Sequence, residues 1–178
     1  MPLEDLKYPI GKFKMPSQIT TRDLQAYISS IALFPKHLQK VSLSLNDSQL
    51  DTPYRPDGCT IRQLVNHCAD SHMNALIRFK LALTEDTPTI KPYKEAKWAE
   101  LADSTTISIL PALKMLEGIH ERWEYLLKSL NDTDLKRTYM HPEHNKIFTI
   151  EETIALYAWH CNHHLAHVTN VKKTNGWS

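Results

Sequence analysis

Residues 149–173 read TIEETIALYAWHCNHHLAHVTNVKK and combine a helix start, a helix-spaced apolar stripe and a cluster of histidines. Thr149 and Glu152 have the spacing of a capping box, in which each side chain satisfies a backbone amide of the first turn. The apolar residues that follow recur every three or four positions: Ile150, Ile154, Tyr157, Cys161, Leu165 and Val168. Asn175-Gly176 is a typical helix stop. This stretch therefore predicts a helix over about 149–173 that is buried along one face.

Three more stretches have helical periodicity, over about 20–45, 60–83 and 107–130. Pro35 is expected to bend or split the first of them, and Thr60-x-x-Gln63 supplies a capping box for the second. The rest consists of an irregular N-terminal arm over 1–19 and polar connections, the longest over 84–106. Residues 1–178 are therefore predicted to form a single domain, an all-α, up-down four-helix bundle.

The composition argues against several classes of protein. Lysine and arginine number 21 against 20 acidic residues, so the chain lacks the basic excess that is typical of nucleic-acid binding. The N-terminus leads into no apolar segment, so we expect a cytoplasmic protein with no membrane association. Cys59, Cys68 and Cys161 form no C-x-x-C pair and are expected to be reduced. Cys68 and Cys161 occupy apolar-stripe positions and are assigned to core packing.

The helix over 149–173 contains two overlapping H-x-x-x-H pairs, His160/His164 and His163/His167. Residues four apart stack one turn above another, so both imidazoles of a pair can reach one metal ion. On a helical wheel His160 and His164 border the buried stripe, His163 points toward solvent and His167 is intermediate. The wheel therefore favours His160 and His164 as ligands.

A third ligand is expected from the helix over 60–83, which carries His67 and His72. His72 falls within the apolar stripe, whereas His67 shares the polar face with Ser71, Asn74 and Arg78. The wheel alone does not choose between the two histidines. The competing interpretation is a non-catalytic helical module, in which the histidines only pack, form hydrogen bonds or buffer metal. The zincin motif H-E-x-x-H is absent.

Several strings resemble proteins of the DinB/YfiT superfamily of four-helix bundles, and the resemblance runs essentially from end to end. The strings are DTPYR at 51–55, ADSHMN at 69–74, IRFKL at 77–81, His141-Pro142 and Y-x-WH-x-x-HH-x-x-H at 157–167. The superfamily comprises metal-dependent hydrolases and thiol-dependent transferases that use bacillithiol or mycothiol. By position, the resemblance implies His67, His160 and His164 as metal ligands.

Three imidazoles leave a zinc or nickel ion its double charge and an open coordination position, as in catalytic sites. We expect one such ion per subunit and a homodimeric protein. The resemblance favours transfer of a low-molecular-weight thiol, of the bacillithiol kind, to an electrophilic substrate. The alternative is a hydrolase that uses metal-bound hydroxide.

Four further residues of the second helix are candidates for the site. Hydrolysis would need an acid or base, for which Asp70 and His72 are the candidates, although both could instead orient ligand imidazoles. Asn74 and Arg78 are predicted to contact a carboxylate of the thiol or of the substrate.

Overall fold

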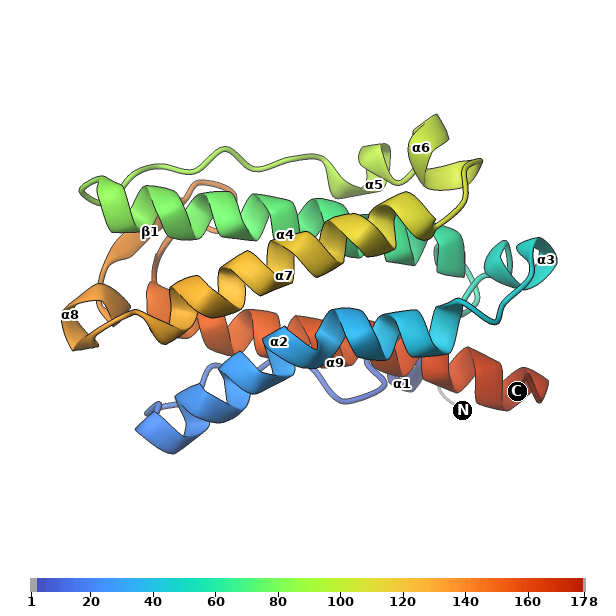
Figure 1. The fold of residues 1–178 in the computed structure, drawn as a ribbon, viewed down its shortest axis with the longest axis horizontal. Helices are drawn as coiled ribbons and strands as arrows, with labels where there is room; N and C mark the ends of the chain where they lie inside the picture. Colours follow the sequence, from blue (N-terminus) through green and yellow to red (C-terminus); the bar gives the residue numbers. More distant parts are fainter. Residues whose placement is uncertain (1–2, 178) are drawn as a thin grey trace.

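The computed structural model describes residues 3–177 and shows a bundle of long helices (Figure 1). The long helices are α2 (Thr21–Ser42), α4 (Ile61–Thr84), α7 (Leu110–Lys128) and α9 (Ile150–Asn175). The predicted four-helix bundle is confirmed, and each predicted boundary lies within three residues of the observed one. Pro2, which the sequence places in the N-terminal arm, lies outside the described residues.

The helices begin where their capping residues predict. Thr60 and Gln63 form a reciprocal capping box at α4, and Thr149 and Glu152 form one at α9. Gly176 ends α9 in the left-handed conformation, with φ of 66°. Pro35 lies inside α2 without splitting it. Local sequence therefore determines where each long helix starts and stops.

The directions of the long helices follow the order up, down, down, up, so α4 and α7 run parallel (Figure 1). Arg62, at the start of α4, donates to the carbonyl of Ile107, just before α7, at 2.8 Å. Lys172 near the end of α9 donates to the carbonyl of Val41 near the end of α2 at 3.1 Å. The connection between α4 and α7 returns the chain alongside α4 to the end of the bundle where α4 begins. Because α7 starts at that same end, it runs parallel to α4, and the predicted up-down alternation is not followed between these two helices.

The core fills the space between the four long helices. Each of α2 and α4 packs on both α7 and α9. The largest completely enclosed side chains are aromatic: Trp123, Phe34 and Phe79. Cys68 and Cys161 are buried in the same core, as predicted. Burial of this apolar surface supplies the main favourable term for folding.

The connections contain short elements that the sequence did not predict. The short helices are α1 (Leu3–Lys7), α3 (Asp47–Leu50), α5 (Glu95–Trp98), α6 (Ala102–Thr105) and α8 (Asp132–Leu135). An antiparallel hairpin of β1 (Thr138–His141) and β2 (Lys146–Thr149) precedes α9 and is a small addition to the all-α architecture that the sequence predicted. Four-residue strands give too short a pattern to distinguish them from loop.

The N-terminal arm lies on α9, as expected of a segment laid over the bundle. Trp159 donates its indole N–H to the carbonyl of Gly11 at 3.1 Å, and the rings of Phe13 and Trp159 are 5.9 Å apart. The arm contains the short helix α1, which corrects its prediction as wholly irregular.

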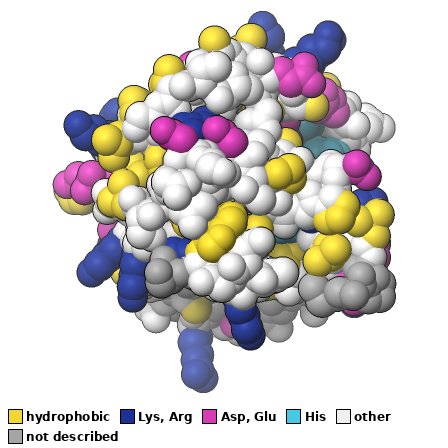
Figure 2. Space-filling model, turned by 90° about the vertical axis from the view of Figure 1, so that its right-hand side faces the viewer, with side chains coloured by type: hydrophobic (Ala, Val, Ile, Leu, Met, Phe, Trp, Pro, Cys, Tyr) yellow, Lys and Arg dark blue, Asp and Glu magenta, His cyan; other side chains and the backbone are white. Residues whose placement is uncertain are grey.

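The surface carries charges of both signs. On the face in Figure 2, basic and acidic side chains are interspersed, and histidine atoms are visible in a recess on one side. Among the described helices, no segment has both the length and the apolar character needed to traverse a bilayer.

Candidate metal centre

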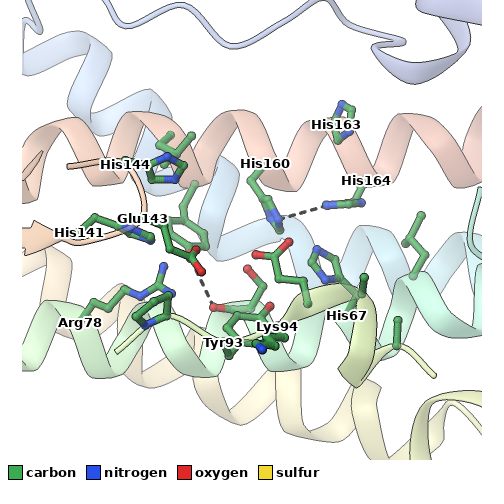
Figure 3. A pocket seen from close by; sticks show the side chains of 18 of the residues that line it. His67, Arg78, Tyr93, Lys94, His141, Glu143, His144, His160, His163 and His164 are labelled. Atoms are coloured by element: carbon green, nitrogen blue, oxygen red, sulfur yellow. Dashed lines mark hydrogen bonds between the residues drawn. The ribbon is translucent and has the colours of Figure 1, made fainter. Parts of the chain in front are cut away.

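Three histidines from two antiparallel helices converge at the middle of the bundle (Figure 3). His67 comes from α4, and His160 and His164 come from successive turns of α9. One ring nitrogen from each lies within 4.8 Å of the other two. The Nε2 atoms of His160 and His164 are 3.1 Å apart. The structure thus brings together the three residues that the resemblance implied.

The spacing of these nitrogens suits one metal ion. Two imidazole nitrogens, each about 2.0–2.1 Å from an ion and separated by a tetrahedral angle, lie about 3.4 Å apart. The observed 3.1 Å between His160 and His164 is close to this value. A ring nitrogen of His67 lies within 4.8 Å of both.

The electrostatics of the cluster favour neutral imidazoles, the form that binds metal. Burial lowers the pKa of His67, His160 and His164, and for His160 and His164 the neighbouring histidines lower it further. Glu95 partly opposes this shift at His67. The Nδ1 atom of His164 is buried without a hydrogen-bond partner among the described residues. Three neutral donors that face one another fit a divalent cation.

Of the two histidines of α4, His67 lies in the cluster and His72 lies outside it. His72 is completely buried, and its Nε2 atom lies 3.0 Å from Nδ1 of His160. His72 therefore contacts Nδ1 of His160, whereas Nε2 of His160 faces His164. His67 faces His160 and His164 directly, with ring centroids 5.6 and 4.9 Å away.

The second histidine pair of α9 lies differently from its prediction. His163 was expected to point toward solvent, but it is half-buried and lines a cavity. His167 was expected to be intermediate, but it is buried against the ring of Tyr54 at 4.3 Å. The wheel considered only the four long helices, whereas the N-terminal arm and the connection before α4 cover this face. The ring of Tyr8, for example, lies 6.2 Å from that of His163.

The three-histidine cluster opens onto a cavity of about 850 Å³. Arg78, a candidate substrate-binding residue, lines this cavity, and its Nε atom is buried without a partner among the described residues. Asp70 and Asn74 are not among the residues that line it. The side chain of Asn74 instead donates to the backbone carbonyl of Asp70 at 2.9 Å. Helical position alone could not show which polar residues the α4–α7 connection covers.

Sequence reasoning missed the cavity-lining residues that lie in the connections between the long helices. Tyr93 and Glu95 come from the segment that runs along α4, and His141 and His144 come from the hairpin. The hydroxyl of Tyr93 is buried without a partner among the described residues, and burial raises its pKa. The ring of Tyr93 packs on that of Trp98 in the same connection, with ring centroids 4.6 Å apart. The polar length of the connection was the available signal for a functional role.

The match to a family model agrees with this geometry. The model described as the DinB superfamily matches residues 32–168, which include all three histidines of the cluster. The chain belongs to the DinB superfamily.

Three curated proteins from Bacillus and Halalkalibacterium species are similar to this DinB superfamily member. "Putative metal-dependent hydrolase YfiT" of Bacillus subtilis (strain 168) is 45% identical over 174 residues, covering 98% of each chain. "Putative metal-dependent hydrolase" of Bacillus cereus (strain 03BB102) is 50% identical over 175 residues, covering 98% of this chain and 100% of the relative. "Putative metal-dependent hydrolase BH0277" of Halalkalibacterium halodurans is 48% identical over 164 residues, covering 92% and 95%.

A solved structure has the same fold as this DinB superfamily member. It is described as "YfiT from Bacillus subtilis is a probable metal-dependent hydrolase with an unusual four-helix bundle topology". Its TM-score is 0.95 at 45% identity, covering 98% of this chain and 99% of that chain. The names of the relatives and the three-histidine cluster together indicate a metal-dependent enzyme.

Proposed function

We propose that this protein is a metal-dependent S-transferase, which joins a low-molecular-weight thiol of the bacillithiol kind to an electrophilic substrate. The observation that carries the proposal is the cavity of about 850 Å³, which joins the three-histidine cluster to the guanidinium of Arg78. Arg78 lies three helical turns beyond His67 on α4, about 16 Å along the axis. A cavity of this extent suits a molecule much larger than water.

His67, His160 and His164 would hold the ion, for which zinc and nickel are the candidates. When bound by three neutral imidazoles, such an ion supplies a Lewis acid that lowers the pKa of a coordinated thiol or water. The ring nitrogens of the cluster lie at the cavity wall, so a sulfur atom can approach from the open side.

Arg78 is suited to hold the acidic end of the thiol. Its side chain forms no ion pair within 4.0 Å among residues 3–177, and its Nε donor is buried and unpaired. A ligand carboxylate that accepts two parallel N–H bonds from the guanidinium would satisfy this unpaired donor. The hydroxyl of Tyr93 lines the same cavity and supplies a further donor without a partner there.

The proposed transfer forms one bond and breaks another. The sulfur electron pair forms a carbon–sulfur bond while the bond from that carbon to its leaving group breaks. A halide departs with the bonding electrons, or the oxygen of an opened epoxide takes up a proton. The thiol proton is released to water at the mouth of the cavity. Tyr157 and Phe148 line the wall and offer apolar contact to the electrophile.

Hydrolysis is the second candidate, because a carboxylate lines the same cavity. Glu95 is near enough to His67 to oppose the lowering of its pKa, and it is exposed to solvent. A carboxylate in this place could act as a general base toward water. The names of the relatives also support this candidate.

The test is a steady-state assay of bacillithiol with a fluorogenic electrophile, using protein purified without a nickel column. We expect turnover that a chelator removes and that added zinc or nickel restores. Arg78→Met should raise the KM for bacillithiol about 10–100-fold, the loss expected of a charged hydrogen-bonding group, with a smaller change in kcat. The exposed residue His37 provides the control substitution His37→Ala, which should change neither constant.

Glu95→Gln separates the two candidates. Loss of ester or amide hydrolysis by about 10²–10⁴-fold would support hydrolysis with Glu95 as the base. Thiol transfer that survives this substitution would support the S-transferase. Chelator-insensitive turnover, or none with bacillithiol, would overturn the proposed transfer. Bound metal without either activity would identify a non-catalytic metal-binding module.

A further inference from the structure

Pro35 leaves one backbone carbonyl of α2 without its helical partner. In an α-helix the carbonyl of residue 31 accepts from the N–H of residue 35, and proline has no N–H. Ile31 is completely buried, so water does not readily replace this donor. Nδ1 of His120, on α7, lies 2.6 Å from the Ile31 oxygen and supplies the missing hydrogen bond.

This hydrogen bond begins a chain that crosses the whole bundle. Nε2 of His120 lies 2.7 Å from Nδ1 of His72, and Nε2 of His72 lies 3.0 Å from Nδ1 of His160. The four members, Ile31, His120, His72 and His160, come from α2, α7, α4 and α9 respectively. Each long helix therefore contributes one member, and the last is a candidate metal ligand.

The surroundings hold the middle of the chain in place. His72 and His120 are 0% and 1% exposed. The ring of His72 lies edge-on to Phe34, Tyr157 and Trp123, with centroids 5.2, 5.6 and 6.0 Å away. These aromatic neighbours restrict rotation of the His72 ring, so its two nitrogens keep their present partners.

A carbonyl at one end of the chain fixes the direction of every hydrogen bond in it. The Ile31 oxygen only accepts, so Nδ1 of His120 must donate, and Nε2 of neutral His120 must then accept. Nδ1 of His72 therefore donates to His120, and Nε2 of neutral His72 accepts. Nδ1 of His160 then donates to His72, which leaves the lone pair of His160 on Nε2. That atom is the one that faces His164.

We propose that His120 and His72 are positioning residues, which use the Ile31 carbonyl freed by Pro35 to fix the tautomer and ring orientation of His160 for metal binding. This inference rests on the three-histidine metal site, but not on whether the substrate is a thiol or water. A ligand whose Nδ1–H is already paired needs no change of tautomer when the metal binds. Such partners commonly strengthen metal binding by about 10–100-fold.

The direct test uses the unsubstituted, metal-free protein, so its result does not depend on the enzymatic activity. Long-range ¹H–¹⁵N correlation of the imidazole rings distinguishes the two neutral tautomers. We expect His120, His72 and His160 all to carry the proton on Nδ1 at neutral pH. An Nε2–H tautomer at any of the three positions would overturn the proposal.

Zinc titration of two variants tests the effect on the ligand. His72→Phe removes the acceptor for His160, and we expect the Kd for zinc to rise about 10–100-fold. His72→Gln can accept from His160 and donate to His120 through one amide, so it should restore most of the affinity. Ser42→Ala, at a buried position in α2 where the side-chain hydroxyl donates to the Leu38 carbonyl, is the control for a general core perturbation.

Equal zinc affinity in folded His72→Phe and in the unsubstituted protein would contradict the positioning role. So would equal weakening by Phe and Gln, which would indicate packing alone. If His72→Phe does not fold, the tautomers of the unsubstituted protein still decide the question.

Discussion

Replacing His67 by alanine should remove metal binding while leaving the fold in place. The three candidate ligands differ in how the rest of the protein holds them. His160 is hydrogen-bonded to His72, and His164 is 9% exposed. His67 is half-buried, and its ring forms no hydrogen bond with the residues that the structure describes. His67→Ala therefore separates coordination from packing more cleanly than His160→Ala, which also breaks the chain to His72.

The size of the effect follows from binding to the native state alone. At a free zinc concentration 100-fold above Kd, binding stabilises the native state by about 2.7 kcal/mol. For a chain of 178 residues, 1 kcal/mol corresponds to about 2–4 °C in Tm, so zinc should raise Tm by about 5–10 °C. Truncation of the half-buried His67 ring should cost the metal-free protein only about 1 kcal/mol.

The assay is thermal unfolding followed by circular dichroism, with chelator and then with excess zinc. The unsubstituted protein and His37→Ala should both show the zinc-dependent rise in Tm, whereas His67→Ala should show little of it. Elemental analysis of each dialysed protein gives the bound metal directly. A full zinc-dependent rise in His67→Ala, or none in the unsubstituted protein, would refute the assignment of this site.

Three further predictions concern stability. Arg62→Leu should lower the free energy of unfolding, measured with urea, by about 2–4 kcal/mol. Arg62 is 4% exposed and donates to Asp47, Asp51 and the Ile107 carbonyl at 2.7–2.8 Å. A loss below about 1 kcal/mol would show that these hydrogen bonds contribute little. Burial raises the pKa of Asp70 from 3.8 to about 6, so stability is lost as the pH rises between these values and the loss is complete above pH 6. After allowance for its partial exposure, Asp70→Asn should stabilise by about 1 kcal/mol at pH 8 and by almost nothing at pH 4, and equal effects at both would contradict this. Burial lowers the pKa of His120 from 6.5 to about 4, so the unfolded chain takes up the proton first as the pH falls. His120 should contribute about 3 kcal/mol to a loss of stability between pH 6.5 and 4 in metal-free protein, in addition to the loss from the other buried histidines. Equal free energies from urea unfolding at pH 7.5 and 4.5 would disprove it.

The sequence predicted the helices well because their signals are local. Thr60 with Gln63 and Thr149 with Glu152 are capping boxes within one turn, and the apolar stripes repeat within each helix. The pair His160/His164 was likewise readable, because both residues lie on one helix at one-turn spacing. The hairpin before α9 was missed because its strands are only four residues long.

The choice of the third histidine could not be made from helical position. His67 and His72 both occur in α4, and the resemblance rather than the wheel favoured His67. His120 gave no signal, because a single histidine in an apolar helix has the pattern of an ordinary core residue. Its role became visible only when the Ile31 carbonyl was found opposite it.

By itself, the sequence determined the four long helices, their caps and the histidine pair of α9, since these depend on residues a few positions apart. Tertiary structure alone decided which polar side chains share the cavity, because the α4–α7 connection and the hairpin form its walls. It also decided which group forms a hydrogen bond with the Ile31 carbonyl, which lacks its helical donor because of Pro35. The sequence shows a missing N–H, but only the packing of α7 against α2 shows which side chain takes its place.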